Sequence, residues 1–203
     1  MEYAQIASFH HHSAGGITAS APGADLKDYV KVSEDAKLVY ETAPLADPLT
    51  ITGHPVVHLW VSATAKDLDV YANLEDIAPD GTATSYYMDG RLRASHREQQ
   101  DPAYDNLGLP WRTHLEKDTT PLKPNESAEL VFDLFPISYR FQAGHRMRVT
   151  LTFGDPLDAS PEVTIHRSEQ RPSSLVLPVS VDRARNDGSS PSRDGGGTGV
   201  VQN

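Results

Sequence analysis

The sequence predicts an all-β fold, a jelly-roll β-sandwich, and three observations support this prediction. Apolar and polar residues alternate with period two through several short segments, which is the pattern of half-buried strands. Proline and glycine are frequent, at 15 and 14 of 203 residues, and they mark turns between these segments. No segment shows the period of an amphipathic helix with comparable strength. Many short antiparallel strands without helices between them indicate two packed sheets.

Strands are predicted wherever the alternation is regular or a short β-branched or aromatic run stands between turns. The two clearest cases are Pro55–Thr64 and Arg146–Phe153, in which apolar residues recur at every second position. Weaker segments bring the total to about nine strands. These weaker segments are Leu38–Tyr40, Leu49–Ile51, Leu68–Ile77, Thr84–Leu92, Glu129–Phe135, Val163–Ile165 and Leu175–Leu177.

Turn residues separate the strands, and one long stretch between strands stands out. In Pro79-Asp80-Gly81, proline presets its own φ angle and Asp-Gly accepts the positive φ of a tight hairpin turn. By contrast, Gln99–Asn125 shows no strand pattern, and it carries Tyr104 and Trp111. Irregular stretches of this length are uncommon inside a compact domain and are often functional.

The sandwich is expected to occupy residues 29–182, between a flexible arm at 1–28 and a disordered, glycine- and serine-rich tail at 183–203. Both ends lack a periodic apolar face, so they bury too little to offset the entropy of ordering. A chain of 203 residues therefore suits one domain of about 150 residues with loose ends.

Composition excludes several classes of protein. The sequence has no cysteine, which removes disulfides, thiolate metal sites and cysteine nucleophiles. Its net charge of −10 would repel nucleic acid, because that binding depends on neutralising phosphates. No segment predicts a membrane span or an export signal, so we expect no membrane partner. The sequence does not fix the compartment, and the cytoplasm is favoured.

The motifs of common hydrolases are missing from the sequence. There is no Gly-x-Ser-x-Gly nucleophile elbow and no His-Glu-x-x-His motif of the zinc peptidases. A hydrolytic site would have to be built around His145, with Ser95 or Ser138 as its nucleophile. We interpret His145 instead as a structural residue, and we expect no catalytic residue, metal or cofactor in this chain.

Several charged residues are expected to form a structural network rather than a binding site. Arg91 and Arg93 share one face of a predicted strand, where they can pair with acids across the sheet. Asp67 and Asp69 are spaced so that they could offer two oxygens to calcium, but bonds to nearby backbone amides are the simpler interpretation. The candidates for this network are Asp67, Asp69, Arg91, Arg93, His145 and Arg146.

Three aromatic side chains are candidates for a ligand or domain interface. Trp60 falls on the polar face of its predicted strand, whereas Tyr104 and Trp111 belong to the long irregular stretch. Exposed aromatic side chains serve both as sugar platforms and as docking residues. A free-standing carbohydrate- or ligand-binding sandwich is therefore an alternative function.

A series of motifs occurs in one order between Lys37 and Val179. They are Ile51-Thr52-Gly53-x-Pro55, Leu59-x-Val61-Ser62-Ala63-x-Ala65-x-Asp67-x-Asp69, Leu74-Glu75-Asp76-Ile77-x-Pro79-Asp80-Gly81, Gly90-x-Leu92-Arg93-Ala94-Ser95-His96-Arg97, Phe141-Gln142-Ala143-Gly144-His145-Arg146-Met147-Arg148-Val149 and Ser174-Leu175-Val176-Leu177-Pro178-Val179. This series resembles the C-terminal domain of X-Pro dipeptidyl-peptidases and of CocE/NonD (cocaine esterase-like) serine hydrolases.

The resemblance implies a jelly roll of the galactose-binding-like kind, attached in family members to an α/β-hydrolase domain. In those proteins the catalytic serine, aspartate and histidine belong to the hydrolase domain, which comes earlier in the chain and is not seen in this sequence. The resemblance thus implies a non-catalytic domain that docks on a catalytic domain and shapes its pocket. The expected partner is such a domain or subunit, or a second copy of this chain, and we expect the chain alone to be inactive.

Overall fold

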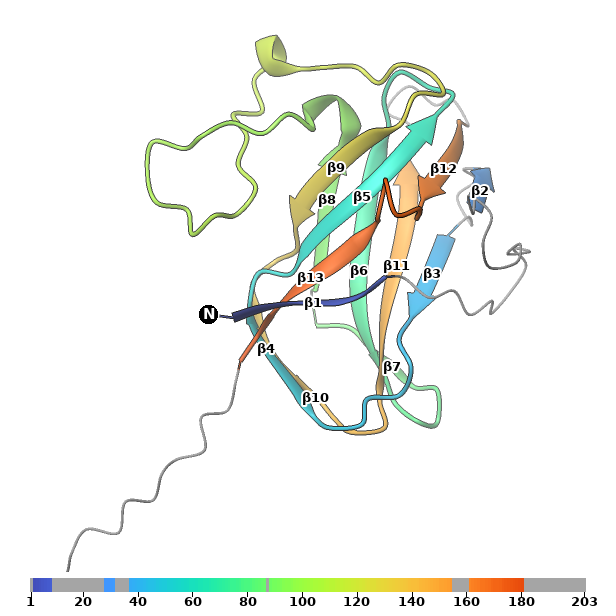
Figure 1. Ribbon diagram of the computed structural model, residues 1–203, viewed down its shortest axis with the longest axis vertical. Helices are drawn as coiled ribbons and strands as arrows, with labels where there is room; N and C mark the ends of the chain where they lie inside the picture. The colour runs from blue at the N-terminus through green and yellow to red at the C-terminus, as the bar shows by residue number, and fades with distance from the viewer. Residues whose placement is uncertain (1, 9–27, 32–36, 87, 155–160, 181–203) are drawn as a thin grey trace, which may run out of the picture.

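The computed structural model describes residues 2–8, 28–31, 37–86, 88–154 and 161–180. Within these residues the chain forms two antiparallel sheets that pack against each other, without an α-helix (Figure 1). The β-sandwich predicted from the sequence is therefore confirmed, whereas its galactose-binding-like kind stays a prediction. Two short 3-10 helices, η1 Ala94–His96 and η2 Glu116–Asp118, interrupt the longest described connection.

The larger sheet has eight strands. They are β1 Glu2–Ser8, β2 Asp28–Lys31, β4 Leu49–Gly53, β5 Val56–Ala63, β9 Ala128–Asp133, β10 Ile137–Phe141, β12 Glu162–His166 and β13 Ser174–Val179. The order is β10-β4-β13-β5-β12-β2, with β9 also paired to β5 and β1 to β13. Strand β5 is the centre of this sheet, because β9, β12 and β13 all bond to it.

The smaller sheet has five strands. They are β3 Lys37–Glu41, β6 Asp69–Ile77, β7 Ala83–Thr84, β8 Asp89–Arg93 and β11 Arg146–Gly154. Their order is β3-β11-β6-β7, and β8 also pairs with β6. The single strand predicted over Thr84–Leu92 is thus divided into β7 and β8, because the chain bends away from the ladder at Tyr86. Strand β8 forms an edge of this sheet.

The core lies between the two sheets and follows the predicted alternation. In β5, Val57, Leu59 and Val61 are fully buried, and the residues between them face outward. In β11, every second residue from Met147 to Phe153 is buried in the same way. Each large apolar side chain buried like this contributes about 1.5–3 kcal/mol. These two strands therefore supply apolar side chains to the core from opposite sheets.

The predicted hairpin turn at residues 78–82 is also confirmed. The amide of Gly81 donates to the carbonyl of Ala78 at 2.8 Å, and Gly81 has a φ of 88°. The Asp80 carboxylate accepts the amide of Thr82 at 2.9 Å. This bond lowers the pKa of Asp80, because it favours the charged carboxylate. Glycine is needed here because a side chain at this φ would be strained.

Three strands of the larger sheet were not among those predicted. Strand β10 follows directly after a proline, and β1 and β2 lie in or beside the stretch expected to be an arm. Strand β1 pairs along β13, from Glu2 opposite Val179 to Ser8 opposite Ser174. Residues 9–27 and 181–203 lie outside the described residues, so the limits of arm, sandwich and tail stay predictions.

Candidate functional site

The large apolar side chains that stay exposed in the described residues come from segments that pair with, flank or bond to strand β8. They come from β6, from the turn between β7 and β8, from the connection after β8, and from the link after β9. That link is bonded to β8, since the amide of Phe135 donates to the carbonyl of Asp89 at 2.9 Å. We call these side chains together the β8 side. Its members are Tyr71, Tyr86, Tyr104, Leu107, Leu115 and Phe135.

A groove crosses the outer face of the smaller sheet within the β8 side. Its larger part has a volume of about 800 Å³ and runs from Tyr71 to Phe135. Its smaller part, about 290 Å³, continues to His96 and His114. The two parts share Tyr71 and Arg91, so they form one continuous depression.

Strand alternation places the groove residues on one face. In β6, Asp69, Tyr71 and Asn73 point outward because the residues between them are buried in the core. The guanidinium of Arg93 donates to both oxygens of Asp69, at 2.9 and 3.1 Å, and this pairing raises the pKa of Arg93. Arg91 has no ion-pair partner in the described part of the chain, so its charge is available to a ligand or partner.

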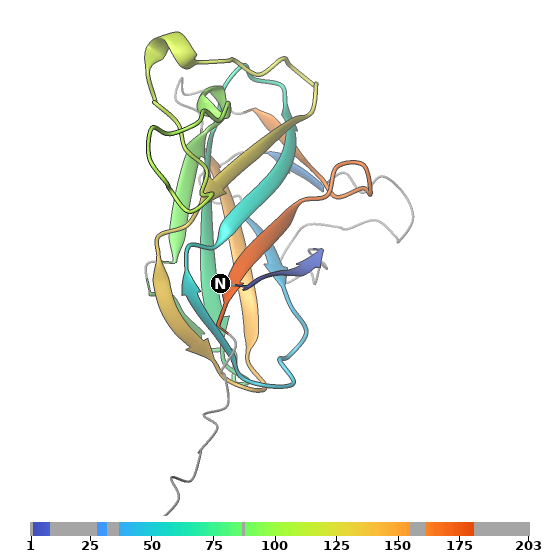
Figure 2. The ribbon, with the colours of Figure 1, turned by 60° about the vertical axis from the view of Figure 1, so that its left-hand side comes forward.

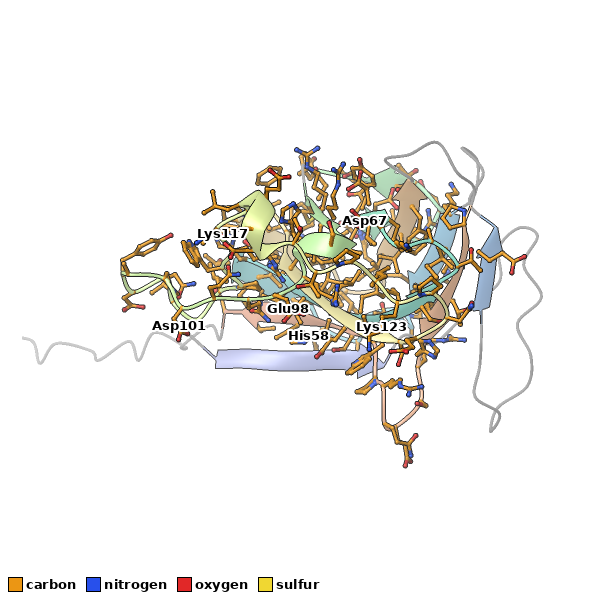
Figure 3. All side chains as sticks on the ribbon, turned by 90° about the horizontal axis from the view of Figure 1, so that it is seen from above. His58, Asp67, Glu98, Asp101, Lys117 and Lys123 are labelled. Atoms are coloured by element: carbon orange, nitrogen blue, oxygen red, sulfur yellow. The ribbon has the colours of Figure 1, made fainter. Side chains whose placement is uncertain are left out.

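The connection after β8 is the long stretch that the sequence predicts, and it projects from one end of the sandwich (Figures 1 and 2). Seen from above, Asp101 and Lys117 mark this projecting part, while His58 lies over the larger sheet (Figure 3). At its base the rings of His96 and His114 lie 5.5 Å apart. Burial lowers the pKa of His114, and the charges of His96 and Arg112 lower it further.

Two arginines hold this connection together, and one of them, Arg112, bonds it to the sandwich. Arg97 donates to the carbonyl of Thr120 and, at 3.3 Å, to that of Ala94. Arg112 donates to the carbonyl of Val131 on β9 and, at 3.1 Å, to that of Arg97. Burial lowers the pKa of Arg112. The connection is therefore held by bonds from charged side chains to backbone carbonyls, which are stronger than neutral hydrogen bonds.

The three predicted interface aromatics lie in two different places. Tyr104 is exposed in the connection, and Trp111 is half-buried there, with its carbonyl accepting the amide of Gln100 at 3.1 Å. Trp60 lies on the outer face of the larger sheet, where it lines a hollow of about 560 Å³ with Glu98 and Gln99. Tyr71 and Phe135, which line the groove, were missed by the sequence analysis.

The predicted charged residues are bonded within the protein with one exception. Arg91, expected to pair with an acid across the sheet, has no ion-pair partner among the described residues. The carboxylate of Asp67 accepts the amides of Leu68 and Ser95, at 2.9 and 2.8 Å, which is the capping role expected as the simpler alternative to calcium. Arg146 lies 3.5 Å from Glu41, which Arg148 also contacts. Within the described ranges, no group of three or more histidine, aspartate or glutamate side chains is placed to hold a metal ion.

His145 belongs to a buried polar group and not to an assembled hydrolytic site. Its Nδ1 lies 2.8 Å from Asp76, whose other oxygen accepts the hydroxyl of Tyr139 at 2.7 Å. Burial and the bond to Asp76 raise the pKa of Tyr139. Ser138 pairs with Thr52 at 3.0 Å, and no serine of the described chain is hydrogen-bonded to His145. This His–Asp pair therefore lacks a nucleophile.

The described residues thus form a β-sandwich of two packed antiparallel sheets. Residues 4–176 match the family described as the X-Pro dipeptidyl-peptidase C-terminal non-catalytic domain, and the chain belongs to this family. The resemblance noted in its motifs is thereby confirmed.

Known relatives are hydrolases several times longer than the matching region. Serine esterases of Mycobacterium bovis and Mycobacterium tuberculosis are 41% identical over 156 residues, covering 72% of this chain and 24% of their own lengths. Cocaine esterase of a Rhodococcus species is 29% identical over 164 residues, covering 71% and 26%. The chain thus spans about a quarter of the curated relatives it matches.

Solved structures share the fold. A CocE/NonD family hydrolase from Staphylococcus aureus superposes with a TM-score of 0.67 at 16% identity, over 81% of this chain and 36% of that one. An α-amino acid ester hydrolase gives 0.57 at 24% identity, over 71% and 25%. Among the described residues, no helix has the length and apolar character that crossing a membrane would need.

Proposed function

We propose that this chain docks on the catalytic domain of a CocE/NonD-type serine hydrolase and helps to shape its substrate pocket, without cleaving bonds itself. The observation that carries the proposal is that the large apolar side chains of the β8 side are exposed, with Tyr71 and Phe135 lining one groove. Interfaces between domains bury about 600–1,500 Å², so a docking domain seen alone leaves such side chains uncovered.

The groove gives the proposed docking surface both apolar and polar contacts. Tyr71 and Phe135 offer aromatic area, and Arg91 offers a guanidinium with no ion-pair partner in the described chain. Side chains of these types dominate the energetics of protein interfaces. Because Asp69 is already paired with Arg93, it would not place an unpaired charge in the interface.

The alternative is a free-standing carbohydrate- or ligand-binding sandwich, and one observation favours it. The same groove combines Tyr71 and Phe135 with the polar side chains of Asn73, Asp89 and Arg91. Stacking on an aromatic ring with hydrogen bonds at its edge is how proteins recognise sugars. The docking proposal is preferred because Tyr104, Leu107 and Leu115 are exposed outside the groove, where a sugar would not cover them.

Two measurements test the proposed function. Purified chain is treated with a fluorophosphonate serine probe and assayed with a nitrophenyl ester and an X-Pro anilide, and we expect neither labelling nor turnover. It is then titrated into the catalytic portion of the Mycobacterium tuberculosis esterase, made without its own matching region, and we expect a saturable complex. A Tyr71→Ser, Phe135→Ser variant should bind about tenfold more weakly. Labelling of one serine with turnover would contradict the proposal.

A further inference from the structure

Within the connection after β8, residues 106–109 form a turn whose backbone conformation is unfavourable for the leucine at its second position. The amide of Leu109 donates to the carbonyl of Asn106 at 3.2 Å, and the two residues between them have positive φ angles. These angles are 61° at Leu107 and 72° at Gly108. Glycine accepts this conformation, but at Leu107 the side chain crowds the backbone, and asparagine is the residue that such turns prefer.

The side chain of Leu107 is also unfavourably placed for an isolated domain. It is 69% exposed, the largest exposed fraction among the large apolar side chains of the described chain, and Tyr104 beside it is 62% exposed. An exposed leucine gains nothing from removal of apolar surface from water. Leu107 therefore combines a strained backbone with an unburied side chain, and neither cost is offset within the described residues.

The tip is held in shape before any partner arrives. The amide of Leu107 donates to the Asp105 carboxylate at 2.9 Å, and the side-chain amide of Asn106 donates to the carbonyl of Leu109 at 2.6 Å. Below the tip, the amide of Thr113 donates to the side chain of Gln100 at 3.1 Å. A loop that is already ordered loses less entropy on binding, so it suits recognition better than a flexible one.

We propose that residues 104–108 form a peg that inserts Leu107 and Tyr104 into an apolar depression on the catalytic domain of the hydrolase. This inference rests on the proposed function. The partner that receives the peg is the catalytic domain, because the matching region spans only 24% of the mycobacterial esterases and is joined there to the rest of the chain. A polar ligand such as a sugar would not select an exposed leucine.

A single substitution separates docking from folding. Leu107→Asn removes the apolar side chain and replaces it with a residue that tolerates positive φ. The isolated variant should therefore melt at the same temperature as the original chain or slightly higher. Its affinity for the catalytic portion of the Mycobacterium tuberculosis esterase, measured by calorimetry, should fall about tenfold. Tyr104→Ser should weaken binding in the same direction.

The control is Lys123→Ala, because Lys123 is exposed in the same connection but pairs only with Glu126 and lies outside the tip. Its affinity should equal that of the original chain. If the original chain and Leu107→Asn bind equally well, the peg is wrong while the proposed function stands. If the original chain does not bind at all, both the peg proposal and the proposed function are contradicted. If instead the chain self-associates and Leu107→Asn abolishes that, the occupant is a second copy and the peg proposal is overturned.

Discussion

The sandwich and the connection after β8 are held in place by different interactions. The strands of the sandwich bury complete apolar faces, with Leu59 and Leu151 among the residues that have no exposed surface. The part of the connection after η1, residues 97–127, has Leu122 as its one buried residue. Its place is fixed instead by Arg97 and Arg112, which donate to backbone carbonyls of the connection and of β9.

This difference explains how the connection can present apolar side chains without collapsing onto the sandwich. A loop that is ordered by burying its own apolar residues has none left for a partner. Here hydrogen bonds from Arg97, Arg112 and backbone amides supply the order, while Tyr104, Leu107 and Leu115 stay exposed. The region best suited to docking is therefore the one that contributes least to the core.

The largest effect should come from a change in the core. Leu59→Ala leaves a cavity between the sheets and should lower the free energy of unfolding by about 3 kcal/mol. Urea unfolding followed by tryptophan fluorescence measures this. The matched control is Leu115→Ala in the connection, which should change stability by less than about 0.5 kcal/mol because its side chain is exposed. Equal losses for the two variants would contradict the comparison.

An intermediate effect should follow when the anchor of the connection is removed. Arg112→Met keeps the length of the side chain but removes its bonds to the carbonyls of Arg97 and Val131. We expect a loss of about 1–2 kcal/mol and, more tellingly, faster protease cleavage within residues 98–118 while the strands stay protected.

The control for this change is Arg146→Met, which removes an exposed arginine. The ion-pair partner of that arginine, Glu41, still pairs with Arg148 in the variant. It should leave the cleavage rate unchanged. If Arg112→Met is as resistant to protease as the original chain, the connection is ordered by something other than this arginine.

The sandwich was largely predictable because its signal is local. Alternation in β5 and β11 identifies the buried faces directly, as the burial of Val57 and Val149 shows. Strand β10 was missed although Ile137, Tyr139 and Phe141 alternate with polar residues, because the run is short and follows a proline. The alternation was therefore present but too brief to separate from a turn.

The candidate site was less predictable because its contacts join distant parts of the chain. Arg93 and Asp69 carry opposite charges and lie in neighbouring strands, and both were among the residues expected to form the structural network. The partner of Arg146 could not be named, since Glu41 lies on β3, about a hundred residues away. The bonds of Arg112 go to carbonyls, which every residue possesses, so no side-chain pattern reports them.

The smallest effect should come from pH, through His114 at the base of the connection. Burial, His96 and Arg112 lower the pKa of His114 below its usual 6.5, so the folded chain takes up this proton less readily than the unfolded chain. The contribution of neutral His114 to the stability of the folded chain is therefore fully present above pH 6.5. It declines as the pH falls through 6.5 towards the lowered pKa.

The test compares melting temperatures at about pH 8 and about pH 5.5 for the original chain and for His114→Gln. All groups other than His114 are common to both proteins, so their effects cancel in the difference. We expect the glutamine variant to lose less stability on acidification, by a small margin because His114 is exposed. Parallel pH profiles would show that protonation of His114 does not change the stability of the chain.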